Sequence, residues 1–283
     1  MSRFLRRTFA ARTTFVLAAT ALGGCFFFQG QSNNNQAATD LASSTPSGKQ
    51  LGLIEISGAR NSQTSTDFTS ISAAFFTEPS GCTEKVDGAC TIKHCPPSLD
   101  PIQYRRAGQL TIAGGARNYS LAPTDSGAYG KVDNAGPPFA GGDKITLTAA
   151  GDLVPAFSIE AVAPFQIVAE QPKIVGGALS VSASKPLALA WSGSPGGDVL
   201  GVLTRYSSSG EVTTAYCRFA GEAGTGQLPQ AVVQTVAQAV GDTITFGMIS
   251  RNQTTKLVGG YSVQLNLTFA PTNVALGAVT FVP

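Results

Sequence analysis

The chain has 283 residues, of which 43% are hydrophobic, so it can form one or two domains around a sizeable core. Charged residues make up only 13%, about half of the ~25% that is usual, whereas glycine and proline contribute 32 and 16 residues. This composition argues against a helical bundle and favours short strands joined by turns. The net charge of +2 provides no basic surface for nucleic acid, and the single histidine excludes most general acid–base mechanisms at neutral pH.

The first 24 residues have the pattern of an export signal. Four arginines within residues 1–12 precede an apolar run over 13–24, which is too short to span a bilayer and typical of a signal peptide. The run ends in Leu22-Gly23-Gly24-Cys25, which resembles the lipobox of bacterial lipoproteins. That resemblance implies cleavage before Cys25 and a covalent diacylglycerol on its thiol, with a further acyl chain such as palmitate.

Further residues bear on the export route and the membrane. Arg6-Arg7 resembles a twin-arginine signal, but the flanking residues depart from that pattern, so the general secretory route is favoured and the other stays open. Phe26 stands where aspartate would retain an enteric lipoprotein in the inner membrane, so the resemblance implies the outer membrane, on its periplasmic face or at the cell surface. After the three phenylalanines at 26–28, the residues up to 50 are mostly small and polar, which predicts a flexible tether over 25–50.

From residue 51 onward, apolar and polar residues alternate, which predicts half-buried strands. The clearest runs are 67–78, 142–149, 187–191, 212–219 and 262–269. Their core-facing residues are expected to be Ile71, Ala73 and Phe75; Ile145 and Leu147; Leu187, Leu189 and Trp191; Ala215, Cys217 and Phe219; and Val263, Leu265, Leu267 and Phe269. We therefore expect an all-β protein of antiparallel sheets packed as sandwiches.

Only residues 229–240 have helical spacing. Val233, Val236, Ala237 and Val240 recur at the interval of a helix face, Pro229 suits its first turn, and Gly241 suits its end. We predict one short helix that crosses between sheets and covers a core.

Two tandem sandwiches are the predicted organisation. The sequence GDKIT at 142–146 returns as GDTIT at 241–245, which indicates a duplication with halves of ordinary domain size. We place the boundary near Pro164, with a first β-sandwich over 51–164 and a second, Ig-like β-sandwich over 165–283. The second half is expected to fold alone.

Four cysteines follow the lipobox, an even number suited to an oxidising compartment: Cys82, Cys90, Cys95 and Cys217. Asp87-Gly88 predicts a hairpin turn. A hairpin centred there places Cys82 and Cys95 near opposite positions on one face and Cys90 on the other, so we predict a Cys82–Cys95 disulfide. Cys90 and Cys217 then remain, either as partners across the halves or as separate thiols.

The sequence provides little catalytic chemistry, and we assign no catalytic residue and no metal ligand. A zinc site would use His94 with the cysteines at 82, 90 and 95, but their spacing matches no usual site, and His94 is expected on a surface loop. Carboxylates occur singly, so no spacing pairs two of them for glycoside hydrolysis. Asp133 and Asp143 flank a loop that lacks a calcium-binding pattern and are expected to be solvated.

Some features also resemble a group of proteins. They are the lipobox, the Phe75-Phe76 pair followed by the three cysteines at 82–95, and the strand from Leu187 to Gly193. Together they are similar to uncharacterised two-domain envelope lipoproteins of the myxobacterial type. The resemblance reaches most of the mature chain, and it implies neither an active site nor a cofactor other than the covalent lipid at Cys25.

We therefore expect a lipid-anchored, non-enzymatic protein of the cell envelope that serves adhesion, scaffolding or ligand binding. Its expected partners are the membrane, through the lipid, and an envelope protein or a surface polymer, with the loops 127–142 and 207–211 as candidate binding segments. Two alternatives stay open. A hydrolase would show an acidic pair or a bound metal in one cleft. An accessory lipoprotein of a secretion or export system would show an exposed apolar patch or a free sheet edge.

Overall fold

The computed structural model describes residues 49–61, 66–78, 81–97, 102–193, 195–237, 242–272 and 276–282. The predicted signal peptide and most of the predicted tether precede residue 49. The predicted lipidation site Cys25 and the predicted lipobox residues Leu22, Gly23 and Gly24 therefore lie outside the described residues.

The described chain is an all-β protein with one α-helix, as the alternating sequence predicts. Its strands are β1 (Gln50–Asn61), β2 (Thr66–Thr77), β3 (Thr83–Asp87), β4 (Cys90–Cys95), β5 (Leu110–Ala113), β6 (Tyr119–Leu121), β7 (Tyr129–Asp133), β8 (Lys144–Ala149), β9 (Phe157–Val162), β10 (Val168–Gln171), β11 (Ala178–Ser182), β12 (Leu187–Ser192), β13 (Asp198–Tyr206), β14 (Val212–Ala220), β15 (Thr225–Leu228), β16 (Thr243–Val258), β17 (Tyr261–Phe269) and β18 (Leu276–Val282). A 3-10 turn (Gly221–Ala223) and the helix α1 (Gln230–Val236) complete the elements.

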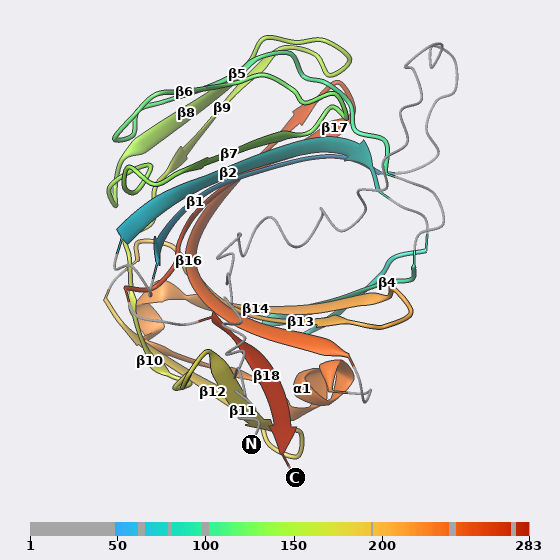
Figure 1. Ribbon diagram of the computed structural model, residues 1–283, viewed down its shortest axis with the longest axis vertical. Coiled ribbons are helices and arrows are strands. Elements are labelled where there is room, and N and C mark those ends of the chain that lie inside the picture. The colour runs from blue at the N-terminus through green and yellow to red at the C-terminus, as the bar shows by residue number, and fades with distance from the viewer. Residues whose placement is uncertain are drawn as a thin grey trace, which may run out of the picture.

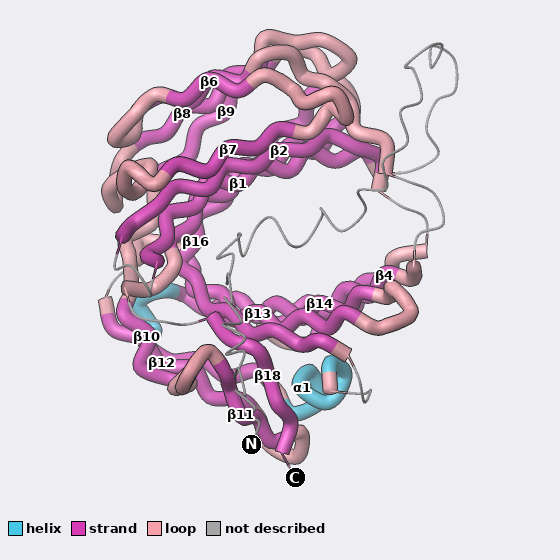
Figure 2. The backbone as a smooth tube through the Cα atoms, viewed as in Figure 1, coloured by secondary structure: helices cyan, strands magenta, loops and turns pink. Residues whose placement is uncertain are grey.

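One large, strongly curved sheet organises the molecule (Figure 1). Its strand order is β3-β4-β14-β13-β16-β17-β1-β2-β7, and β18 and β11 continue it beside the first part of β16. The sheet bends at β16, so that β17, β1, β2 and β7 form a first arm and β13, β14, β4 and β3 form a second arm facing it. Figure 2 shows the same strands lining a concave side.

Two smaller sheets cover the outer, convex side of the arms. The four-stranded sheet β6-β5-β8-β9 packs on the first arm and encloses a core that includes Ile54, Phe75, Leu147 and Leu265. The three-stranded sheet β10-β12-β15, with α1, packs on the second arm and encloses another core around Trp191. Each arm is therefore one layer of a sandwich.

Strand β16 joins the two arms because its two ends pair with different neighbours. Residues 243–251 pair with β13, whereas residues 250–258 pair with β17. The two pairings overlap at Ser250 and Arg251, which places the bend there. The Ser250 side chain is fully buried and its hydroxyl donates to the carbonyl of Phe269 at 3.4 Å.

The predicted strand faces are confirmed. The core-facing residues named from the sequence are buried, apart from Phe219, which packs half-buried against the second core. Trp191 is 3% exposed, and its indole Nε1 donates to the carbonyl of Gly221 at 2.7 Å. It is a core residue, as its alternation with Leu187 and Leu189 predicts.

Two sandwich cores are present, but the division into independent tandem halves is not confirmed. The predicted boundary near Pro164 falls between β9 and β10, which belong to the two different small sheets. The large sheet crosses this boundary twice. The hairpin β3–β4 of the first half pairs with β14 of the second, and β17 of the second half runs parallel to β1 of the first.

The helix is shorter than the residue spacing suggests. α1 covers Gln230–Val236, with Pro229 as its N-cap instead of its first residue. Val232, Val233 and Val236 are fully buried in the second core, so the helix covers that core as predicted. Residues 238–241, which include the predicted stop at Gly241, lie outside the described residues.

Both pairs of cysteines form disulfides between neighbouring strands. Cys82 is bonded to Cys95, as predicted. Cys90 is bonded to Cys217, so these two cysteines are partners across the halves and not separate thiols. The hairpin turn consists of Gly88 and Ala89, with Gly88 at φ 59°, one residue later than the sequence indicates. In this register, Cys82 falls opposite Cys95, and Cys90 lies directly opposite Cys217.

The two disulfides are expected to contribute unequally to stability. They close loops of 13 and 127 residues, and the chain-entropy relation gives the longer loop about 2 kcal/mol more stabilisation. Replacing Cys90 and Cys217 together by alanine should therefore lower the free energy of unfolding more than replacing Cys82 and Cys95. Urea unfolding of the two double variants measures the difference. An equal or larger loss in the Cys82/Cys95 double variant would contradict this ranking.

Candidate functional site

A cleft of about 550 Å³ lies on the concave side of the curved sheet. Strands of both arms line it, together with β16 and β17 at the bend (Figure 1). Its volume falls within the range of ~300–1,000 Å³ that is typical of small-molecule sites. Along each arm, every second side chain points away from the core. Because the sheet bends, these side chains of the two arms face one another across the cleft.

Two apolar walls face each other across the cleft. On the second arm, Leu200 and Val202 of β13 cluster with Ile249 of β16, and Tyr216 packs beside them. On the first arm, Leu51 and Leu53 of β1 pack with Ala74 and Phe76 of β2. All of these except Phe76 line the cleft. Aliphatic side chains dominate both walls, which suits the hydrocarbon part of a ligand.

A polar floor joins the walls at the bend. The strand register places Glu55 of β1 opposite Asn266 of β17 and opposite Ser72 of β2. It also places Arg251 of β16 opposite Thr268 of β17. These five residues all line the cleft. The Thr268 hydroxyl donates to Glu55 Oε1 at 3.4 Å.

Two buried polar atoms of this floor have no hydrogen-bond partner among the described residues. They are the Nε of Arg251 and the Oδ1 of Asn266. Burying a polar group without a partner is costly, and for a charged group the cost is larger. Burial accordingly lowers the pKa of Arg251, while Asp198 acts in the opposite direction and Arg218 adds to the lowering. The floor is thus incompletely satisfied by the chain itself.

Glu55 is the other charged residue of the floor. Burial raises the pKa of its carboxyl to about 7, although the Thr268 hydrogen bond and the charge of Arg251 both act to lower it. Glu55 therefore changes its charge near neutral pH. Among the described residues, no second carboxylate contributes to this shift.

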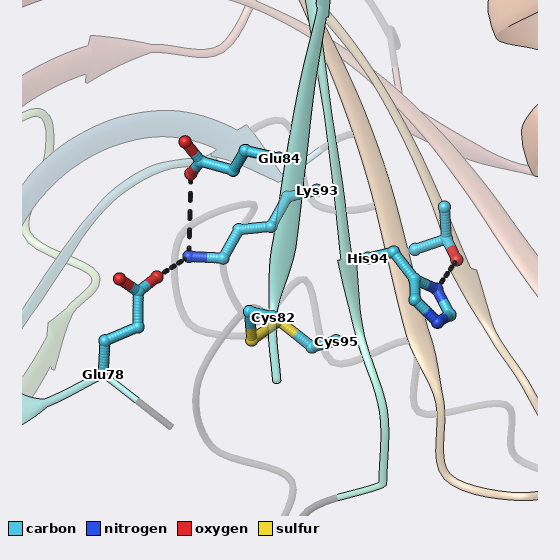
Figure 3. Close-up of a disulfide and its surroundings, with 7 residues drawn as sticks. Glu78, Cys82, Glu84, Lys93, His94 and Cys95 are labelled. Atoms are coloured by element: carbon cyan, nitrogen blue, oxygen red, sulfur yellow. Dashed lines mark hydrogen bonds and ion pairs between the residues drawn. A yellow bond between two sulfur atoms is a disulfide. The ribbon is translucent and has the colours of Figure 1, made fainter. Parts of the chain in front are cut away.

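Ion pairs stand at the rim of the cleft. The ammonium of Lys93 on β4 contacts the carboxylate of Glu78 and lies 3.8 Å from that of Glu84 (Figure 3). The Nε of Arg218 lies 2.6 Å from Asp198 Oδ2. These acidic residues are isolated in the sequence, and the fold brings two of them onto one lysine. Because both are engaged by a cation, they do not form a free acidic pair.

The residues of the zinc set considered from the sequence are not available together as metal ligands. Cys82, Cys90 and Cys95 are all in disulfides and cannot act as thiolate ligands. His94 lies in strand β4, not on a surface loop, and its Nδ1 is 3.0 Å from the hydroxyl of Thr213. Figure 3 shows that it points away from Lys93, because adjacent strand residues face opposite sides. Within the described ranges, no three His, Cys, Asp or Glu residues are grouped for a metal ion.

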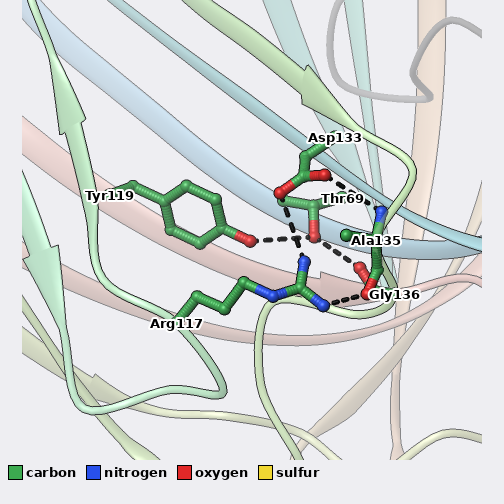
Figure 4. Close-up of polar contacts among 6 residues, drawn as sticks. All are labelled: Thr69, Arg117, Tyr119, Asp133, Ala135 and Gly136. Carbon is green, nitrogen blue, oxygen red and sulfur yellow. Dashed lines mark hydrogen bonds and ion pairs between the residues drawn. The ribbon is translucent and has the colours of Figure 1, made fainter.

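Asp133 is part of a structural contact and is not simply solvated (Figure 4). Arg117 Nη1 lies 3.2 Å from its Oδ2, and the backbone N–H of Ala135 donates to its Oδ1 at 3.0 Å. The hydroxyl of Thr69 donates to the carbonyl of Gly136 at 2.8 Å and fixes the same turn to β2. Asp143, the other candidate, accepts the N–H of Ala140 at 2.8 Å. Residues 129–133 of the predicted loop over 127–142 thus form β7, and Asp133, Thr69 and Asp143 fasten the segment that follows it.

Sequence analysis missed the two charged residues of the floor. One indication was present for Glu55, which is a single carboxylate within the apolar run from Leu51 to Ile56. Another was the change in β16 from apolar to polar residues at Ser250-Arg251, where the strand passes from one arm to the other. Neither indicates a cleft until the curvature of the sheet is known.

Comparison with known proteins gives no family for this chain: no family model matches it, and no curated protein matches it either. Of the helices within the part of the chain that the structure describes, none has the length and apolar character to cross a membrane.

Proposed function

We propose that this chain is a lipid-anchored, non-enzymatic protein of the bacterial outer membrane that binds a ligand in the concave cleft. The cleft carries the proposal, because two apolar walls meet at a polar floor where Arg251 Nε and Asn266 Oδ1 have no hydrogen-bond partner within the described part of the chain. The lipobox ending in Cys25 supports the lipid anchor and the location. A few convergent polar groups in an apolar concavity are typical of a binding site.

Binding is tested with the mature chain made without lipid, residues 26–283, which contains every described residue. The probe is N-phenyl-1-naphthylamine, a dye whose fluorescence rises in apolar sites. Leu200→Arg places a charge on one wall, and Leu53→Arg places one on the other. Each should weaken dye binding about tenfold or more, because a charge in an apolar site is strongly unfavourable.

Val175→Arg is the matched control, since Val175 is 78% exposed and does not line the cleft. It should leave dye binding unchanged. Thermal unfolding of all three variants verifies that each is folded. If both wall variants fold and bind the dye as the unchanged protein does, the cleft is not the binding site.

A hydrolase remains the second candidate because of one observation, the carboxyl of Glu55, whose pKa of about 7 would suit a general acid. Hydrolysis with two carboxylates needs a second one near the first. The other acidic residues that line the cleft, Glu78 and Glu84, contact Lys93 at its rim. The proposal therefore favours binding over hydrolysis.

An accessory role in secretion or export is supported by the edges of the large sheet. In the described part of the chain, the strand order ends at β3 on one arm and at β7 on the other. A partner strand could add to either edge through backbone hydrogen bonds. Val86 and Val132 on these strands are 72% and 62% exposed.

A further inference from the structure

Arg251 differs from the paired cations of the cleft in what surrounds it. Arg218 is paired with Asp198, and Lys93 is paired with Glu78. The side chain of Arg251 forms no ion pair with any described residue, and its buried Nε has no hydrogen-bond partner. The floor of the cleft therefore contains a partly buried cation whose Nε would be satisfied by an anion or another acceptor.

An anion from a ligand would satisfy this requirement. The guanidinium presents a planar set of donors that suits a carboxylate or a phosphate, and such charge-assisted bonds are the stronger ones. Arg251 is accessible to a ligand because it lines the cleft. Asn266, also on the floor, would provide a neutral amide beside the same anion.

An apolar wall begins immediately next to Arg251. Ile249 precedes it by two positions on β16 and therefore lies on the same face of the strand. Leu200 is directly opposite Ile249 on β13, and Val202 clusters with both. A molecule whose head group lies at Arg251 would thus have its next atoms against aliphatic side chains.

Extending the proposed function, on which this inference rests, we propose that the ligand is a single-chain amphiphile with an anionic head group. Its carboxylate or phosphate accepts hydrogen bonds from Arg251, and its hydrocarbon chain lies between the wall around Leu200 and the wall around Leu53. A fatty acid and a single-chain phospholipid share this chemistry, and the head group distinguishes them.

Glu55 makes the binding depend on pH. The charged or titratable groups that act on Arg251 are Asp198, Arg218, Tyr216 and Glu55, and its β17 neighbours Thr268 and Asn266 are neutral. Below the pKa of about 7, Glu55 is neutral and does not repel an anion; above it, Glu55 is charged and competes for Arg251. An anionic ligand should therefore bind more tightly as the pH falls from 8 to 6.

The test measures displacement of the naphthylamine dye by decanoate, decyl phosphate and decanol, which share a chain and differ in head group. At pH 6, at least one anion should bind about tenfold or more tightly than decanol, as expected for a charged hydrogen bond. Decanoate remains ionised there, since an unperturbed carboxyl titrates near pH ~4. The anion that binds more tightly identifies the head group.

Arg251→Met keeps an aliphatic stem and removes the charge. It should abolish the preference for the anion, so that decanoate and decyl phosphate bind no more tightly than decanol, and Arg251→Lys should keep part of the preference. Lys49→Met removes a charge from the exposed rim of the same cleft and should change the preference little. Glu55→Gln should remove the increase in decanoate affinity between pH 8 and pH 6.

The outcomes separate this inference from the proposed function. Equal affinity for decanol and both anions, or an undiminished preference in folded Arg251→Met, would refute the anionic head group while leaving the cleft as a binding site. Failure of the dye and of all three decyl compounds to bind would refute the proposed function itself.

Discussion

A fragment of residues 166–283 should fail to fold as a cooperative monomer, contrary to the expectation from the sequence. Its strand β17 would lose β1, its parallel partner, and its strand β14 would lose β4. Four side chains of β17 that are at most 6% exposed (Val263, Leu265, Leu267 and Phe269) would lose the first core. At ~1.5–3 kcal/mol for each buried apolar side chain, this loss is comparable to the total stability of a domain.

The secondary structure, the oligomeric state and the cooperativity of the fragment are measured by circular dichroism, size-exclusion chromatography and urea unfolding. The control is residues 49–283, made in the same way, which retain both cores and should unfold cooperatively. Adding residues 49–165 to the fragment should restore a cooperative transition, because the missing strands would again pair. A monomeric fragment that unfolds cooperatively by itself would show that the sharing of strands is dispensable.

Local patterns were sufficient to predict the individual strands. Alternation along 142–149 and 262–269 depends only on the two-residue period of a strand, so the buried faces of β8 and β17 followed directly. The Cys82–Cys95 disulfide was predictable for the same reason, since a short hairpin fixes which residues are opposite. Cys90 and Cys217 are 127 residues apart, and no local pattern brings them together.

The sequence does not predict which strands pair with one another. For that reason the predicted arrangement of two tandem sandwiches is not confirmed. The repeated sequences at 142–146 and 241–245 do each lead into a strand. However, β8 lies in the four-stranded sheet, whereas β16 connects the two arms of the large one. A period of two identifies a strand and its faces but contains no information about its neighbour.

The cleft could not be predicted from the sequence, for a geometric reason. Glu55 and Arg251 occupy outward positions of their strands, and on a flat sheet they would be ordinary solvated residues. The bend of β16 at Ser250 turns the outward faces of both arms inward and leaves these two residues desolvated. The curvature of the sheet arises from how the strands pack together, so the sequence of a single strand does not predict it.

Replacing Cys25 with alanine should abolish membrane retention, and it is the second change with a very large expected effect. The lipobox implies that a diacylglycerol anchors the mature chain at Cys25, joined to the sulfur by one thioether and carrying two ester-linked acyl chains, usually with a third chain on the amino nitrogen. Two chains bind a bilayer stably at ~0.8 kcal/mol per buried methylene, whereas one binds only marginally. Cells grown with labelled palmitate and then fractionated should show label and membrane association for the unchanged protein and neither for Cys25→Ala.

Gly24→Ala is the matched control for this experiment, because it alters the lipobox but keeps a small residue before the cysteine. It should remain labelled and membrane-bound. Both substitutions precede residue 49, and dye binding in the cleft should be equal in the two proteins. If Cys25→Ala protein stays in the membrane fraction at the level of the unchanged protein, the chain is not anchored by a lipid at Cys25, and the proposed location at the outer membrane loses its support.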